Sequence, residues 1–139
     1  MGGAGARSIG SLGAGQVDRL GNANSTAVPP ILLLVGSGGA NDVASAASEV
    51  VLTCPADPLR VVERVPYRTF TGHRVRALAT DAGVLTKYPD EHELVLTAVP
   101  GSRHLLTDAV ARARAIFGWP LAVADDLAPF ADPDPAELR

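Results

Sequence analysis

The chain has 139 residues, of which 47% are hydrophobic and 4% aromatic, and its net charge is −3. This length suits one domain with a sizeable core, and the charge gives no general drive toward nucleic acid or a membrane surface. No apolar run approaches the ~20 residues that a membrane-spanning helix needs. The single cysteine, Cys54, excludes an intrachain disulfide. Because the N-terminus also shows no basic-then-apolar leader pattern, we expect a cytoplasmic protein.

The N-terminal third predicts a β-hairpin. Residues 8–15 are compatible with a strand, although their glycines weaken it. A turn is expected over residues 16–22, where Asp18 opens it and Gly21 supplies a positive φ angle. Residues 24–28 return as the second strand of the hairpin.

A buried strand, a glycine turn and a short helix are predicted next. Residues 31–35 are all apolar, which is typical of a strand buried on both faces. Gly36, Gly38 and Gly39 follow, and such glycines let a ligand approach the main chain closely. Unpaired amides at the helix entrance could hold an anion, or an oxygen that becomes one during a reaction. The alternative is a tight turn that packs the helix on a sheet.

The rest of the chain predicts further strands and one amphipathic helix. Residues 50–54 form an apolar strand, and alternating patterns over 60–65, 67–71 and 75–80 suggest more. Residues 84–85 and 93–99 are expected to pair as strands. Apolar residues recur at helical spacing over 105–117. Residues 121–124 predict a last short strand, with an acidic, proline-rich tail over 128–139.

Several ordered motifs together resemble one known family. Leu-Gly-Ala-Gly-Gln-Val-Asp-Arg-Leu-Gly-Asn-Ala-Asn stands at 12–24, Gly-Ser-Gly-Gly-Ala-Asn-Asp at 36–42 and Thr-Asp-Ala-Gly-Val at 80–84. With Leu-Val-Leu-Thr at 94–97 and Pro-Leu-Ala-Val-Ala-Asp-Asp at 120–126, they resemble the β (B) subunit of family I coenzyme A transferases. The glutaconate and 3-oxoacid types are the most similar. The resemblance runs over roughly residues 5–127.

The resemblance implies an open α/β fold, with a mixed, largely parallel sheet and flanking helices. It implies an oligomer in which an α and a β subunit share one site. There, coenzyme A moves from an acyl thioester to a free carboxylic acid, so coenzyme A is a substrate and no cofactor is expected. A glutamate of the β subunit attacks the thioester carbonyl, which yields an acyl anhydride and then a glutamyl-CoA thioester.

The resemblance also assigns roles to residues of this chain. Gly38 and Gly39 are expected to donate main-chain N–H groups to the oxyanion, where such donors contribute ~3 kcal/mol each. The residues expected to bind substrate are Gly36, Ser37, Ala40, Asn41 and Gln16.

The chain departs from the family in its nucleophile. The family's glutamate lies in a Glu-Asn-Gly or Glu-Ser-Gly motif upstream of the segment that matches Gln16, whereas no acidic residue precedes Asp18 here. We therefore expect an N-terminally short β-subunit-like domain over residues 1–127, with the attacking carboxylate supplied from elsewhere. The alternatives are a non-catalytic acyl-CoA-binding or scaffolding remnant and an acyl-CoA hydrolase-like relative.

The remaining candidates have structural interpretations. Cys54 is interpreted as inert packing, and Glu49 and Glu63 as solvated charges at strand ends. Asp18 and Asn22 are interpreted as turn formers. The arginines over residues 60–76 suit a solvated sheet face, with CoA phosphates as the alternative contact. No metal is expected because His73, His92 and His104 lack metal-ligand spacing.

Overall fold

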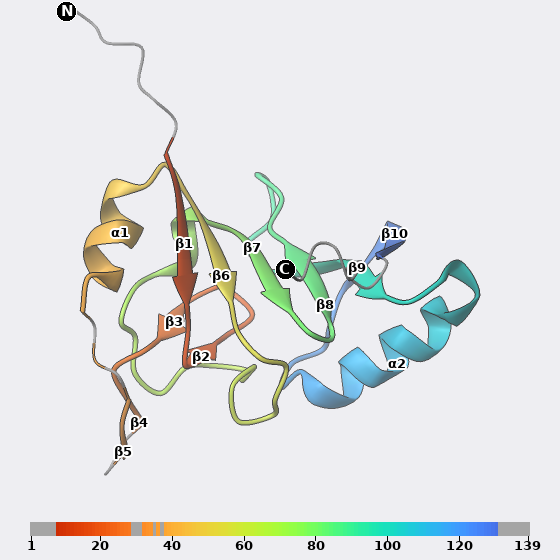
Figure 1. The fold of residues 1–139 in the computed structure, drawn as a ribbon, viewed down its shortest axis with the longest axis horizontal. Helices are drawn as coiled ribbons and strands as arrows, with labels where there is room; N and C mark the ends of the chain where they lie inside the picture. Colours follow the sequence, from red (N-terminus) through yellow and green to blue (C-terminus); the bar gives the residue numbers. More distant parts are fainter. Residues whose placement is uncertain (1–7, 29–31, 35, 37, 131–139) are drawn as a thin grey trace, which may run out of the picture.

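One six-stranded mixed sheet organises the chain in the computed structural model, which describes residues 8–28, 32–34, 36 and 38–130. The strands lie in the order β1 (Ile9–Gly13), β6 (Glu49–Thr53), β7 (Val75–Thr80), β8 (Gly83–Thr86), β9 (Val95–Pro100) and β10 (Val123–Phe130). Neighbours are parallel except at β7–β8 and β8–β9. The predicted α/β class with a mixed, mostly parallel sheet is confirmed (Figure 1).

Two α-helices flank the sheet. Figure 1 shows α1 (Ala40–Ala46) beside β1, and α2 (Leu106–Ile116) below the opposite half of the sheet. Gly10 of β1 permits the close approach of α1, because a Cβ atom there would lie 2.8 Å from Val43 Cγ1. Two 3₁₀ turns, η1 (Gly72–Arg74) and η2 (Arg103–Leu105), precede β7 and α2.

The predicted amphipathic helix is confirmed as α2. Ala109 and Ala113 are buried on its sheet-facing side, while Arg112 and Arg114 are exposed. The helix ends at Phe117, whose ring meets that of Trp119 edge to face with centroids 4.9 Å apart. The hydrophobic core includes buried aliphatic side chains of the sheet: Val50, Leu52, Leu78, Leu85, Leu96 and Val99.

The predicted hairpin over residues 8–28 is wrong in both strands. β1 belongs to the main sheet, and residues 24–28 divide between β3 (Ala23–Asn24) and β4 (Ala27–Val28), which lie in separate two-stranded sheets. β1 pairs in parallel with β6, with Gly10 opposite Val50. A much tighter hairpin forms from β2 (Gln16–Val17) and β3 (Ala23–Asn24). The predicted turn is correct, since the Gly21 N–H donates to the Asp18 carbonyl (2.8 Å) at φ +75°. The turn residues define a hairpin locally, but they do not define which strand continues beyond it.

The strand predicted over residues 31–35 is not buried on both faces. β5 (Leu32–Leu33) pairs with β4 (Ala27–Val28) in a two-stranded ribbon outside the main sheet. Leu33 is 79% exposed, and residues 31 and 35 lie outside the described part of the chain. An apolar run indicates a strand but not its neighbours, and here β1 occupies the place beside β6.

The alternating patterns over residues 60–71 predict strands, and the structure corrects this. These residues form two isolated bridges, Val17 with Val61 and Ala23 with Phe70. The alternation reflects burial of Val61 and Phe70 against the β2–β3 hairpin, so the arginines between them do not line a sheet face. At the other end of the chain, β10 continues to Phe130, beyond the predicted domain end at Leu127.

Candidate functional site

An open cleft of about 1020 Å³ lies where three parallel strands end. Strands β1, β6 and β7 end at Gly13, Thr53 and Thr80, and all three residues line the cleft. In open α/β sheets, ligands bind outside the carboxyl ends of the strands. A concave site with mostly apolar walls is the usual form of a small-molecule site. The cleft therefore has the position and shape expected of a binding site.

The predicted glycine turn forms one wall of this cleft. Gly36, Gly38, Gly39 and Ala40 all line it. Gly36 has φ +90° and Gly38 φ +45°, a region that side-chain-bearing residues rarely adopt. A Cβ atom at Gly36, Gly38 or Gly39 would meet nothing within 4 Å, so the turn is open and not packed against a neighbour.

Two amides of this turn have no acceptor among the described residues. Among the described residues, the N–H groups of Gly38 and Gly39 donate no hydrogen bond, while the Gly39 carbonyl accepts from the Val43 N–H (3.0 Å). Helix α1 has only seven residues, so its dipole contributes little at its N-terminus. The fixed amides, more than the helix dipole, make this wall suited to an oxyanion.

Two of the predicted substrate-binding residues are not brought to the cleft. Gln16 is buried, donates to the Leu59 carbonyl (2.9 Å) and accepts from the Asn24 amide (2.9 Å), so its polar atoms are used. Asn41 is exposed on α1 and borders a different, smaller hollow near His73. Ser37 lies outside the described residues.

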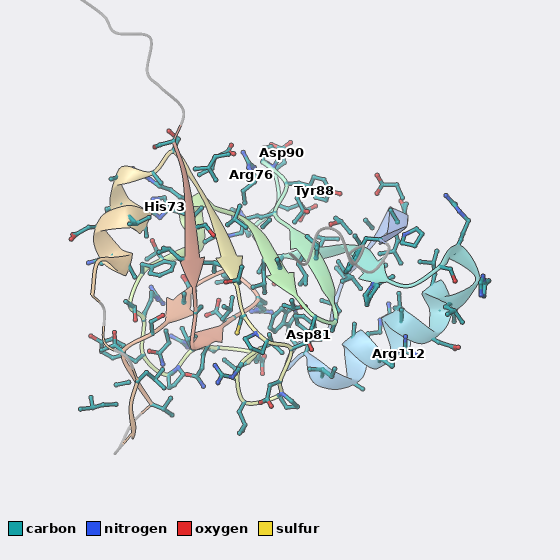
Figure 2. The ribbon with its side chains drawn as sticks, in the orientation of Figure 1. His73, Arg76, Asp81, Tyr88, Asp90 and Arg112 are labelled. Carbon is teal, nitrogen blue, oxygen red and sulfur yellow. The ribbon has the colours of Figure 1, made fainter. Side chains whose placement is uncertain are left out.

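The cleft contains two charged residues that the sequence analysis does not place in the site. Arg60 and Asp81 line it, and Asp81 accepts a hydrogen bond from the Ala56 N–H (2.6 Å). Figure 2 shows Asp81 at one end of the sheet, with His73, Arg76 and Tyr88 at the other. Asp81 directly follows β7, so the rule about carboxyl strand ends would have identified it had the parallel pairing been known.

Cys54 borders the cleft as a protonated thiol. Its side chain is buried, and burial raises the pKa of the thiol from 9.0 to about 11. Because the thiolate is the nucleophile, a thiol with such a pKa is unreactive near neutral pH. The interpretation of Cys54 as inert packing agrees with this environment.

Asp18 supports the hairpin beneath the cleft. Its carboxylate accepts hydrogen bonds from the Leu20 N–H (3.0 Å), the Asn22 N–H (3.1 Å) and the Asn22 side-chain amide (3.0 Å). Lys87 donates to the carbonyls of Leu20 and Gly72 close by, and burial lowers the pKa of its ammonium group. Asp18 and Asn22 are thus turn formers, as predicted.

Other candidate groups lie apart from the cleft. Glu49 pairs with Arg76 (3.3 Å) and Glu63 is exposed, and neither lines it. Within the described residues, no group of three His, Cys, Asp or Glu side chains is placed to hold a metal ion. No helix in the described part of the chain is long and apolar enough to cross a membrane.

Comparison with known proteins finds a curated relative and similar solved structures. No protein-family model matches the chain. It is 28% identical over 153 aligned residues to the B subunit of the 3-oxoadipate CoA-transferase of Pseudomonas knackmussii, an alignment that covers 94% of this chain and 56% of that protein. The chain thus spans about half the length of this curated relative.

Two solved structures share the fold. Glutaconate coenzyme A-transferase from Acidaminococcus fermentans superposes with a TM-score of 0.78 at 23% identity, covering 94% of this chain and 55% of that one. The decarboxylase AibA/AibB superposes with a TM-score of 0.76 at 24% identity, covering 94% and 54%. The resemblance seen in the motifs is therefore present in the sequence of a relative and in the fold of solved structures.

Proposed function

From its similarity to the β subunits of family I coenzyme A transferases, we propose that this chain is a component of an enzyme that moves coenzyme A from an acyl-CoA thioester to a carboxylic acid. Its part is to supply the oxyanion-binding amides of Gly38 and Gly39. The observation that carries the proposal is the open glycine turn, which lines a cleft at the carboxyl ends of parallel strands. Among the described residues, the N–H groups of Gly38 and Gly39 in this turn donate no hydrogen bond.

The chemistry of transfer suits such a turn. When a carboxylate attacks the thioester carbonyl, the carbonyl oxygen becomes an oxyanion before the coenzyme A thiolate leaves. Donors held in place before the reaction stabilise that charge without reorganising, and each contributes ~3 kcal/mol. Gly36 and Gly38 adopt positive φ angles, which glycine permits, and apolar walls strengthen the electrostatic effect of any amide that faces the cleft.

The attacking carboxylate comes, in this proposal, from outside the described residues. Asp81 is the one carboxylate among the described residues that line the cleft, and it is bonded to the Ala56 N–H. No glutamate lines the cleft in the described part of the chain. We therefore assign the nucleophile to a residue outside the described part of this chain, within an oligomer that includes an α subunit or a second chain. The relative's designation as a subunit supports a partner.

Reconstitution tests the proposal. The chain is combined with candidate partner chains that carry a Glu-Asn-Gly or Glu-Ser-Gly motif, and transfer of coenzyme A from an acyl-CoA to a labelled carboxylic acid is measured. Acyl-CoA should form an enzyme-bound thioester that hydroxylamine cleaves with loss of activity. The Gly38→Val variant should slow transfer, whereas Glu63→Gln, on an exposed side chain away from the cleft, should not.

The alternatives give different outcomes. Release of free acid and coenzyme A without transfer would support an acyl-CoA hydrolase-like enzyme. Binding of acyl-CoA without turnover in every combination would support a non-catalytic binding or scaffolding role. Full transfer activity in the Gly38→Val complex would contradict the assignment of the oxyanion site to this turn.

A further inference from the structure

The main sheet is wound in one direction only. The connections from β1 to β6, from β6 to β7 and from β9 to β10 each join parallel neighbours, and each moves toward the β10 edge of the sheet. Connections between parallel strands are almost always right-handed, so those that move the same way lie on the same face. Helices α1 and α2 belong to two of these connections. The topology therefore places both helices on one face of the sheet.

The hydrophobic core agrees with this topology. Ala44 of α1 and Ala109 of α2 belong to one cluster of buried residues, together with Leu52, Leu78 and Leu96 of the sheet. In Figure 1 neither α-helix passes in front of β6, β7 or β8. Within the described residues, the two helices and the buried side chains of the sheet thus share a single core.

The opposite face of the sheet has no such cover among the described residues. Val51 lies between the buried Val50 and Leu52, and because side chains alternate along a strand it points away from that core. The register pairs Val51 with Ala77 and Ala77 with Thr86, which extends this face across three strands. We call it the open face, and its partly exposed side chains are Val51, Ala77, Val84, Thr86, Thr97 and Ala98.

The open face has the composition of the centre of an interface. Its four apolar residues neither belong to the core cluster nor pack against it. The hydroxyl groups of Thr86 and Thr97 bond to each other (2.9 Å), so they are paired within the face. The ion pair of Glu49 with Arg76 (3.3 Å) lies beyond Val51, toward the start of β6. An uncharged centre beside a charged rim is typical of surfaces that bind another protein.

We propose that the open face is the docking surface for a layer of amphipathic α-helices on a second polypeptide. Sheets rich in parallel strands occur with helices on both faces. The chain spans about half the length of the relatives that share its fold, so those proteins contain enough additional chain for a second layer. Thr53 and Ala79 lie on the same face and also line the cleft, so the docked layer would border the cleft. The inference rests on the topology and is independent of the proposed function.

A second copy of this chain fits the open face less well. Two sheets pack about 10 Å apart, and the side chains of both must interdigitate to fill that space. Ala77, Ala98 and the threonines are too short to fill it from both sides, and the gaps would lose packing contacts. A helix can approach small side chains closely and brings longer side chains of its own. The size of these residues therefore favours helices over a second sheet.

Binding in trans tests the proposal. The probe is the part of the Pseudomonas knackmussii B subunit that lies outside the aligned 56%, produced as a separate polypeptide. It is mixed with the full chain, and complex formation is followed by sedimentation velocity. A one-to-one complex is expected. Ala77→Arg and Val84→Lys place a charge at the centre of the open face, so each should weaken binding by about tenfold or more. Ala111→Arg, at an exposed position of α2, should leave binding unchanged.

The outcomes separate the docking surface from the proposed function. Circular dichroism identifies the variants that fold, and either folded variant of the open face decides the test. The absence of a complex, or a complex that survives both substitutions, would overturn the proposal. A dimer of the chain alone that Ala77→Arg dissociates would also overturn it and would assign the face to a second copy. If the complex forms through the open face but no combination of chains transfers coenzyme A, the proposed function fails and the docking surface stands.

Discussion

The two ends of the sheet differ in how their polar groups are used. At the carboxyl ends of β1, β6 and β7, the cleft has few charges, and the amides of Gly38 and Gly39 and the Arg60 side chain are little used by the fold. The opposite end has a hollow of about 410 Å³ lined by many charged or titratable side chains: Glu49, His73, Arg74, Arg76, Lys87, Glu91 and His92. Figure 2 labels His73 and Arg76 at this end.

Several charged side chains of the second end have hydrogen-bond or ion-pair partners within the fold. Arg74 donates to the Ala47 carbonyl (2.8 Å) just after α1, Arg76 pairs with Glu49 (3.3 Å), and Lys87 donates to the Gly72 carbonyl (2.7 Å). A cluster of charged residues is therefore not by itself evidence of a site. The more informative feature is a polar group that borders a cleft and has no partner.

The largest expected effect concerns Gly38. In a reconstituted complex, Gly38→Val keeps the main-chain N–H but disfavours the backbone conformation that holds it and adds a side chain beside the cleft. The turnover number should fall by about 10²-fold, the loss typical when one oxyanion donor is displaced. Because φ at Gly38 is +45°, valine should also reduce the free energy of unfolding by ~1–2 kcal/mol. Asparagine tolerates this backbone conformation better than valine does, so the turnover number and stability of Gly38→Asn should lie between those of the wild type and Gly38→Val. Equal turnover numbers for the wild type and both variants would contradict a catalytic role for this cleft.

A stability effect of about 3 kcal/mol is expected at Asp18. Replacing it by alanine leaves the buried N–H and side-chain amide of Asn22 without their acceptor, and each orphaned buried donor costs ~1–3 kcal/mol. Urea unfolding measures the change. Glu63→Ala, at an exposed position, should stay within about 0.5 kcal/mol. Similar changes in the free energy of unfolding for Asp18→Ala and Glu63→Ala would contradict a stabilising role for the hydrogen bonds of Asp18.

Alkaline pH should weaken the fold through Cys54. Its pKa of about 11 in the folded chain exceeds the ordinary value of 9.0, so the folded state binds more protons between these values. The stabilisation is fully present below pH 9 and is lost as pH rises toward 11. Because the thiol borders an open cleft where water screens charge, we expect ~1–2 kcal/mol. The wild type and Cys54→Ala are compared by urea unfolding from pH 8 to 11, and a constant difference would contradict this.

The smallest effect is expected for the ion pair of the second end. Glu49 and Arg76 are each about two-fifths exposed (41% and 42%), and exposed pairs contribute ~0–1 kcal/mol. Glu49→Gln should therefore lower the free energy of unfolding by less than about 1 kcal/mol, with the difference vanishing in high salt. Transfer activity should not change. A marked loss of transfer would mean that this end contributes to the site after all.

Local pattern in the sequence determined several elements of this protein. Periodicity defined α2 because a helix buries every third or fourth residue, and the apolar residues that became β6 to β9 were recognised as strands. Asp18 and Gly21 defined their turn, and the glycines of residues 36–39 defined a bend open to ligands. These features depend on residues close together in the chain.

Only the tertiary structure decided which segments meet. The parallel pairing of β1 with β6 joins residues 40 positions apart, Gly10 with Val50, and no turn between them encodes it. That pairing brings three strand ends to one edge, where the cleft forms beside Arg60 and Asp81. The apolar run around Leu33 was misplaced for the same reason, since hydrophobicity favours burial but does not specify the surface that buries it.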